Sequence, residues 1–268
     1  MECQVLKNLT QPRLIDQVEV NLTVTTTRVR DHRVIFYRGH LKGTMNQSLH
    51  TPHKSALYAV ALCLFIVTIA NSLAAQQSAR ALFNGKDLDG WQQIGPGSFI
   101  VKDGMMKTEG GMGMLWYTRE KIAHATIRVV FKLTAKESDS GVFIRIPEPP
   151  IEPWMPINRG YEVEIGDWPD DYSCTGVLYT FTKALARPLK PIGEWNTMEI
   201  TINGPRTIVD LNSIKVTDFT EGQAVPPKPP GSHDPDRGPR PDSGFIGLQN
   251  HPGSEVYFRE VSVMPLPQ

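Results

Sequence analysis

The stretch IAHATIRVVFKL, residues 122–133, alternates small or apolar residues with polar ones. Every second position is small or apolar: Ala123, Ala125, Ile127, Val129, Phe131 and Leu133. The positions between them include His124, Thr126, Arg128 and Lys132. Because successive side chains of a β-strand point to opposite faces, this period of two predicts a strand with one buried face.

The same pattern recurs along the chain from residue 75 onward. It is found in GVFIRI (141–146), YEVEI (161–165), TMEITIN (197–203) and residues 206–211, 245–249 and 256–263. Asn203-Gly204-Pro205 is typical of a turn between two such strands. No segment of this region shows an apolar stripe at helical spacing with caps. Short strands joined by turns predict an all-β antiparallel sandwich over residues 81–266.

Two proline-rich segments interrupt the predicted strands, PEPPIEPWMPIN at 147–158 and PPKPPGSHDPDRGPRPD at 226–242. Proline cannot donate a hydrogen bond to a ladder, so neither segment is a central strand. Loops of this length are either functional rims or disordered, and the sequence leaves both alternatives open.

The N-terminal quarter of the chain predicts export. Residues 56–70, ALYAVALCLFIVTIA, carry no charge but are shorter than the roughly 20 residues of a membrane span. Lys54 precedes them, and Ser72-Leu73-Ala74 supplies the small residues that a signal peptidase requires. We therefore expect a signal peptide over residues 45–75 and a secreted or periplasmic protein. An uncleaved membrane anchor is the alternative.

Residues 1–44 lie upstream of this signal, whereas export signals begin near the initiator. Met45 would start a signal of ordinary length. We therefore expect residues 1–44 to be a mis-assigned N-terminal extension that contributes no fold. Their one regular pattern is VEVNLTVTTTRVR, residues 18–30, which could form a strand.

The charge balance excludes several classes of partner. From residue 75 onward the chain carries 20 Lys and Arg against 24 Asp and Glu, a net charge of −4. Without a basic cluster, nucleic acid is not an expected partner, and neither is stable membrane insertion once the signal is cleaved. Cys174 is the one cysteine of this region, so it offers neither an intrachain disulfide nor a cysteine zinc cluster.

The polar residues most suited to chemistry lie in GYEVEIGDWPDD, residues 160–171. Glu162 and Glu164 are two apart on a predicted strand, so both carboxylates share the face opposite Val163. Two adjacent carboxylates raise one pKa, which suits proton transfer. Asp167 follows at the strand end, beside Trp168. The alternative is a solvated strand face without catalytic role.

A second group of candidates comes from distant strands. In GFIGLQNH (244–251), Gln249 ends a strand and His251 follows it, as a general acid or base, a ligand or an ordinary loop residue. Arg145 lies on the face opposite Val142, Ile144 and Ile146, as a sugar clamp or a carboxylate partner. Trp154 and Trp168, both in proline-bearing loops, are the tryptophans expected to be exposed to sugar.

Motifs of other chemistries are absent from the sequence. It contains no glycine-rich phosphate loop, no G-x-S-x-G and no H-E-x-x-H. Nothing in it requires a cofactor. A divalent metal, calcium included, stays open because Asp and Glu side chains are abundant.

Several phrases together resemble one family. They are LFNGKDLDGW (82–91), SGVFIR (140–145), GYEVEI with Asp167, TGVLY (175–179), KPIGEWNTMEITINGPRTIVDLN (190–212) and GFIGLQNH with VYFREVSV (256–263). The chain is similar over residues 81–266 to the 3-keto-disaccharide hydrolase domain family, also described as 3-keto-glucoside 1,2-lyase/3-keto-2-hydroxyglucal hydratase. The resemblance implies a concanavalin A-like jelly-roll sandwich.

The resemblance also implies a reaction. A C3 ketone acidifies the C2 proton of a sugar, a base removes that proton, and the group at C1 leaves by β-elimination. Hydration of the resulting 2-hydroxy-3-keto-glucal completes a net hydrolysis. The polar positions that match the family are Arg145, Glu162, Glu164, Asp167, Gln249 and His251. Within this reaction we expect Glu162 to be the base, because it lies beside a second carboxylate and near Trp168. We expect His251 to be the acid, and Arg145 or Gln249 to support the enolate.

This chain departs from the commoner family pattern at two positions. Glu164 stands where glutamine is frequent, and Asp139 stands where asparagine often precedes the SGV phrase. Glu164 adds a carboxylate to the expected cleft, so the identity of the base and the substrate preference stay open. Two rival functions stay open: a lectin-like module that binds sugar without turnover, and a conventional retaining glucanase, which Glu162-x-Glu164-x-x-Asp167 superficially resembles.

Overall fold

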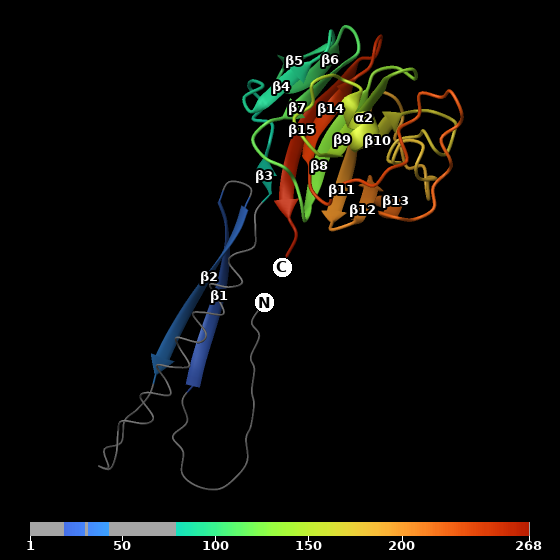
Figure 1. Cartoon of the computed structure of the whole chain (residues 1–268). Helices are drawn as coiled ribbons and strands as arrows, with labels where there is room; N and C mark the ends of the chain where they lie inside the picture. The colour runs from blue at the N-terminus through green and yellow to red at the C-terminus, as the bar shows by residue number, and fades with distance from the viewer. Residues whose placement is uncertain (1–18, 30–31, 43–78, 268) are drawn as a thin grey trace. The chain divides into compact units, whose positions relative to one another are not determined.

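The computed structural model describes residues 19–29, 32–42 and 79–267 and separates the chain into two units, 1–74 and 75–268 (Figure 1). In the first unit, β1 (Glu19–Val29) pairs antiparallel with β2 (His32–Lys42). β1 falls within the alternating segment 18–30. The signal peptide predicted over residues 45–75 lies outside the described residues. Export and the origin of residues 1–44 remain predictions.

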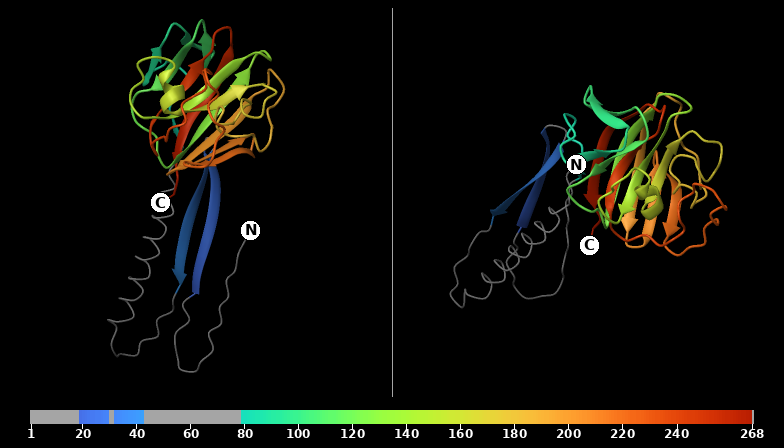
Figure 2. Two further views of the ribbon diagram at one scale, coloured as in Figure 1. Left: turned by 45° about the vertical axis from the view of Figure 1, so that its right-hand side comes forward. Right: turned by 45° about the horizontal axis from the view of Figure 1, so that its top comes forward.

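The second unit contains two antiparallel sheets (Figure 2). The five-stranded sheet has the order β10 (Tyr161–Gly166), β9 (Asp139–Ile146), β14 (Phe245–Asn250), β7 (Gly113–Tyr117) and β4 (Trp91–Ile94). The eight-stranded sheet has the order β13 (Ile214–Thr220), β12 (Arg206–Leu211), β11 (Asn196–Asn203), β8 (Ala125–Leu133), β15 (Val256–Pro265), β6 (Met105–Glu109) and β5 (Ser98–Lys102), and β3 (Arg80–Ala81) pairs with β15. The predicted all-β sandwich is confirmed.

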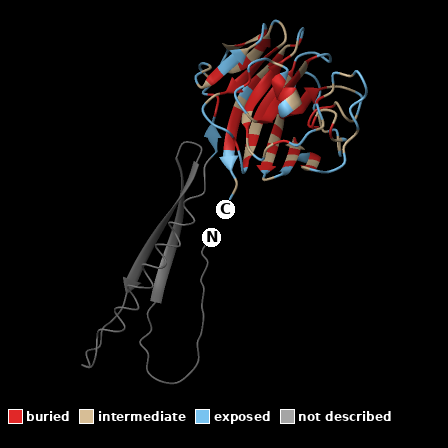
Figure 3. Cartoon of the chain, in the orientation of Figure 1, coloured by how far each residue is buried: buried red, intermediate tan, exposed pale blue. Residues whose placement is uncertain are grey.

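The core lies between the two sheets (Figure 3). β8 contributes Ile127, Val129 and Phe131, the apolar face that its alternation predicts, and β10 contributes Val163 and Ile165. Removing these faces from water is the main driving force for stacking the sheets.

A smaller apolar cluster covers the outward face of the five-stranded sheet. It contains Met114, Trp116, Phe143, Ile146, Met155 and Ile157. The last two belong to α2 (Met155–Arg159), a single helical turn at the end of the predicted loop 147–158, which packs on β9 and β10. This helix therefore covers part of the outward face. No helix among the described residues is long and apolar enough to cross a bilayer.

Candidate active site

A cleft of about 380 Å³ opens on the outward face of the five-stranded sheet. It is lined by Met112, Asp139, Trp154, Ile157, Glu162, Glu164, Trp168, Ser173, Tyr179, His233, Gln249 and His251. This volume lies at the lower end of the range of about 300–1,000 Å³ that is usual for small-molecule sites. Six of the eight side chains that the sequence nominates therefore lie in one cleft, although they come from distant parts of the chain.

Glu162 and Glu164 form one wall of the cleft. Because Val163 and Ile165 point into the core, the alternation of β10 turns both glutamates outward. Their surroundings leave them only 5% and 3% exposed, and the Oε1 atom of each has no hydrogen-bond partner. Buried acceptors without partners are rare in proteins. These two Oε1 atoms are therefore available to accept hydrogen bonds from a ligand.

Burial raises the pKa of both glutamates well above the ordinary value. For Glu162 the charge of Asp139 adds to the effect of burial. For Glu164 the charges of Glu162 and Asp139 add to it, and the Trp168 indole N–H opposes the rise as a hydrogen-bond donor. A carboxylate of raised pKa is a stronger base than a solvated one, which suits removal of a proton from carbon.

Asp139, which was not among the predicted site residues, is the third carboxyl group of the cleft. It begins β9 opposite Gly166, and its Oδ2 lies 3.6 Å from Nδ1 of His251. Burial raises the pKa of Asp139, whereas His251 and a hydrogen bond with Glu164 lower it. Asp139 thus connects the glutamate wall to the histidine, and the pair with His251 becomes an ion pair when the imidazole is protonated.

Gln249 stands across the cleft from Glu164. Glu164 pairs with Gly141 on β9, and Gln249 pairs with Met114 on β7. The pairing of Leu248 with Val142, continued by one residue, places Gln249 opposite Gly141. Gly141 therefore forms a flat floor between the two side chains. Gln249 is 5% exposed and its Oε1 has no hydrogen-bond partner.

Tyr179 extends the glutamate wall and was also missed by sequence reasoning. Its backbone N–H donates to the carbonyl of Glu162 at 2.9 Å, and Leu178 forms a bridge with Val163. Burial and then the charge of Glu164 raise the pKa of Tyr179 to about 12, so its hydroxyl stays protonated and can donate to a ligand. Tyr179 belongs to the phrase TGVLY. This segment contacts β10 through an isolated bridge, and such a contact produces no alternating pattern from which the position of Tyr179 could be predicted.

Thr180, the next residue, has a φ of 61° and a buried hydroxyl without a hydrogen-bond partner. β-Branched residues rarely adopt this left-handed conformation, and such strain concentrates at functional sites. The strain is therefore located beside a residue that lines the cleft.

The structure places Arg145 outside the cleft. Arg145 has a φ of 57°, which breaks the alternation of β9 and places Ile146 in the outer cluster with Phe143 rather than on the face of Ile144. The guanidinium is 1% exposed and donates to Thr207 Oγ1, to the carbonyls of Gly204 and Arg206 and to that of Pro241. It fastens loops and does not reach the cleft.

Asp167 also lies outside the cleft. It lines a separate cavity of about 100 Å³ together with Cys174 and Arg187. The reason is its spacing: an offset of three residues from Glu164 is odd, so the extended chain turns Asp167 away from the glutamate face.

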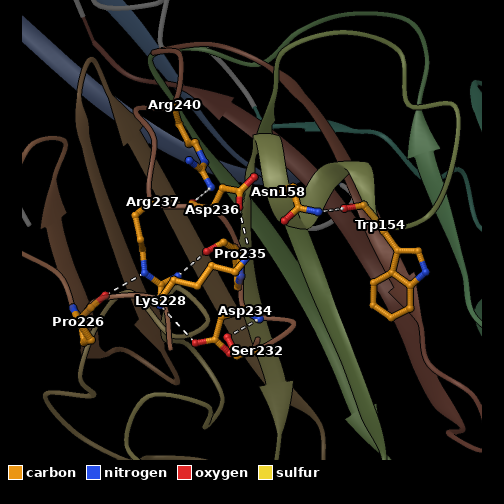
Figure 4. Close-up of polar contacts among 10 residues, drawn as sticks. All are labelled: Trp154, Asn158, Pro226, Lys228, Ser232, Asp234, Pro235, Asp236, Arg237 and Arg240. Atoms are coloured by element: carbon orange, nitrogen blue, oxygen red, sulfur yellow. Dashed lines mark hydrogen bonds and ion pairs between the residues drawn. The ribbon is translucent and has the colours of Figure 1, made fainter. Parts of the chain in front are cut away.

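The long loop 226–242 forms part of the rim and contributes His233. Three arginines fasten it, as Figure 4 shows for Arg237 and Arg240. Arg237 donates from Nε to the carbonyl of Pro226 at 2.9 Å, and Arg240 donates from Nε to that of Gly160 at 2.8 Å. The third is Arg145, through Pro241. The sequence marked this loop as a rim or as disordered without singling out His233.

Trp154 and Trp168 both line the cleft; Trp154 is 51% exposed, and Trp168 is only partly exposed. Among residues 79–267, no three His, Cys, Asp or Glu side chains converge in a way that would hold a metal ion.

Comparison with known proteins agrees with this fold. Two solved structures of candidate glycosyl hydrolases from Parabacteroides distasonis ATCC 8503 match with TM-scores of 0.57 and 0.56, each at 24% identity over 70% of this chain and over 94% and 100% of those chains. A galectin-like protein of unknown function from Bacillus subtilis matches with a TM-score of 0.50 at 12% identity, over 70% of this chain and 94% of that one. At these identities the likeness shows a shared jelly-roll fold.

A search of the curated proteins found no match. The family comparison is decisive, because the model of the 3-keto-alpha-glucoside-1,2-lyase-like domain matches residues 78–264, the whole sandwich with its cleft. The chain therefore belongs to the 3-keto-alpha-glucoside-1,2-lyase-like family of carbohydrate-active domains.

Proposed function

We propose that this protein is an exported enzyme that cleaves 3-keto-glycosides by elimination followed by hydration. The observation that carries the proposal is the buried wall of Glu162 and Glu164, two carboxyl groups with raised pKa and unpaired oxygens in a cleft of sugar size. A C–H bond beside a ketone is a weak acid, and its removal needs a base of this kind held close to it.

In the proposed reaction, Glu162 takes the proton from C2 while the C1–O bond breaks. Protonated His251 gives its proton to the leaving oxygen, and Asp139 at 3.6 Å stabilises the imidazolium before the transfer. Tyr179 and the Gln249 amide group supply the donors that an enolate oxygen requires. The Glu162 carboxyl proton exchanges with the water that enters once the leaving group has departed. Water then adds to C1, His251 takes a proton from that water, and Glu162 delivers a solvent-derived proton to C2. Atoms and charges balance over the two steps.

Two features argue against the rival functions. A retaining glucanase built on Glu162-x-Glu164-x-x-Asp167 would need Asp167 near the glutamates, and Asp167 lines another cavity. A lectin gains nothing from burying carboxylates without partners, since burial of such groups destabilises the fold. Catalytic sites accept this cost because it tunes the pKa of the base.

The test is a matched pair of substrates, a glucoside and the same glucoside oxidised to the ketone at C3. We expect the purified protein to release the aglycone from the 3-keto form and to leave the ordinary glucoside intact. Cleavage of the ordinary glucoside would indicate a conventional hydrolase. Binding of either compound without turnover would indicate a lectin-like module.

A further inference from the structure

The two sides of the cleft differ in chemistry. The β10 side presents Glu162 and Glu164, and the side toward β7 and β4 presents Met112 and Trp154. Met112 comes directly before β7. Trp154 follows Pro153, which packs on the turn after β4: a Cβ at Gly95 would lie 2.5 Å from Pro153 Cγ and 2.7 Å from the Met112 carbonyl. Trp154 and Met112 therefore stand on the same side of the cleft.

The sheet register orders these groups along one line. Glu164, Gly141, Gln249 and Met114 follow one another across β10, β9, β14 and β7. Neighbouring strands are about 4.8 Å apart, so the line is about 14 Å long. A sugar ring in the cleft would have the carboxylates on its β10 side and Gln249 on the other. The group attached to the ring beyond Gln249, the aglycone, would then contact the side of the cleft that carries Met112 and Trp154.

Apart from His251, which the pairing of Asn250 with Gly113 continued by one residue places beside Met112, the apolar side has little to offer a second sugar. Met112 has no hydrogen-bonding group beyond its weakly accepting sulfur, Ile157 at the α2 end of the cleft has none, and Trp154 has only an indole N–H. A sugar buried there would leave hydroxyl groups without partners, which costs binding free energy. An aromatic ring would instead stack on Trp154 and contact the methionine sulfur, both favourable contacts.

The backbone of Trp154 is fixed in this position. Its N–H donates to Glu152 Oε2 at 2.9 Å, and its carbonyl accepts from Asn158 Nδ2 at 3.4 Å, the contact drawn in Figure 4. The indole itself is half exposed at the rim. An aromatic side chain that is partly exposed on a held backbone segment can bind a flat apolar group with little loss of side-chain freedom.

We propose that the Met112–Trp154 side is an aglycone subsite for an aromatic group. The substrates would then be 3-keto-glycosides of aryl or arylalkyl alcohols rather than 3-keto-disaccharides. This inference rests on the proposed function and narrows its substrate class.

The experiment compares a benzyl 3-keto-glucoside with a 3-keto-glucosyl-glucose of the same anomeric configuration. A sugar hydroxyl is a better leaving group than benzyl alcohol, so preference for the benzyl compound reports binding. We expect kcat/KM to favour the benzyl substrate by about tenfold, the scale of one good aromatic contact. Trp154→Ala should remove about this factor for the benzyl substrate and change the disaccharide by less than about twofold.

The matched control is Ile151→Ala, since Ile151 is 86% exposed, belongs to the same loop and does not line the cleft. Ile151→Ala should leave kcat/KM unchanged for both substrates. A preference for the disaccharide, or an equal loss on both substrates in Trp154→Ala, would overturn the inference while leaving the proposed function in place.

A binding measurement separates the two proposals if neither substrate is cleaved. Calorimetry would compare unoxidised benzyl glucoside with methyl glucoside on the wild-type protein and on Trp154→Ala. Tighter binding of the benzyl compound that is lost in Trp154→Ala supports the aromatic subsite even if the proposed reaction fails. Equal binding of the two glucosides contradicts it.

Discussion

The Glu162 carboxyl group lies over Gly141, so closely that a Cβ at residue 141 would stand 2.7 Å from Glu162 Cγ and 2.9 Å from its Cδ. On β9, Gly141 pairs with Glu164 and lies two residues from Phe143, the partner of Glu162. The absence of a side chain there lets the glutamate lean across the floor of the cleft. The position of the proposed base thus depends on a glycine in the neighbouring strand.

We therefore expect Gly141→Ala to displace the carboxyl group and to reduce turnover of a 3-keto-glycoside by about 10²-fold, the scale of a misplaced catalytic group. Circular dichroism should show an intact fold. The control is Gly111→Ala, because a Cβ there would lie 3.5 Å from Pro96 Cγ, an ordinary contact. Normal turnover in Gly141→Ala would mean that the position of Glu162 does not matter for the reaction.

Glu162→Gln keeps the shape of the side chain and removes its basicity. Turnover of a 3-keto-glycoside should fall by about 10²-fold or more, the usual contribution of a general base, while substrate binding changes far less. Steady-state kinetics and calorimetry measure the two effects separately. If the rate stays near normal in a folded variant, the base is another group, and Glu164→Gln is the next variant to measure.

Asp139→Asn should shift the acid limb of the pH profile. The charge of Asp139 contributes to the raised pKa of Glu162, so its removal makes Glu162 easier to ionise. The rise of kcat/KM with pH should then begin at lower pH. Asp210→Asn on β12 is the control and should leave the profile in place. A shift toward higher pH would contradict the electrostatic account.

The raised pKa of Glu164 also makes a prediction about stability. The folded protein keeps this proton above the pH at which the unfolded chain, with an ordinary glutamate near 4.5, loses it. The group's contribution to stability is therefore present in full below about pH 4.5 and is lost as pH rises through the folded-state pKa. Glu164→Gln abolishes this loss.

Differential scanning calorimetry from pH 4 to 8 would test this. The Tm of Glu164→Gln should exceed that of wild type at pH 8, and the difference should shrink toward pH 4. In a domain of this size each 1 kcal/mol of lost stability lowers the Tm by about 2–4 °C. Glu194→Gln, at an exposed position, should follow the wild type. A Tm difference between Glu164→Gln and wild type that widens toward low pH would contradict the raised pKa of Glu164.

The buried guanidinium of Arg145 predicts a structural defect. Arg145→Leu leaves Thr207 and the carbonyls of Gly204 and Pro241 without their donor, so unfolding free energy should fall by about 2–4 kcal/mol. Arg119→Ala, which removes an exposed ion pair with Asp89, should cost less than about 1 kcal/mol. Denaturant titration measures both. A loss in Arg145→Leu no larger than in the control would contradict the role of the arginine as a clamp.

The sequence was sufficient to predict which face of a strand each side chain occupies wherever the alternation is regular. It placed Glu162 and Glu164 on one face of β10 and Val163 in the core, because a regular strand leaves no other choice. It failed at Arg145, where a positive φ in a residue other than glycine breaks the alternation without any signal in the sequence. Asp139 and Tyr179 were missed because their place in the cleft depends on which distant strands become neighbours.

The central claim, that cleavage begins with removal of the C2 proton, has one direct test. The reaction is run in D2O on a 3-keto-glycoside, and the C2 position of the released 3-keto sugar is analysed by NMR and mass spectrometry early in the reaction. Free 3-keto sugar in D2O without enzyme gives the background exchange. We predict one deuterium at C2 of the enzymatic product, because hydration of the glucal takes its C2 hydrogen from solvent. Release of product that retains hydrogen at C2 above this background would contradict the account.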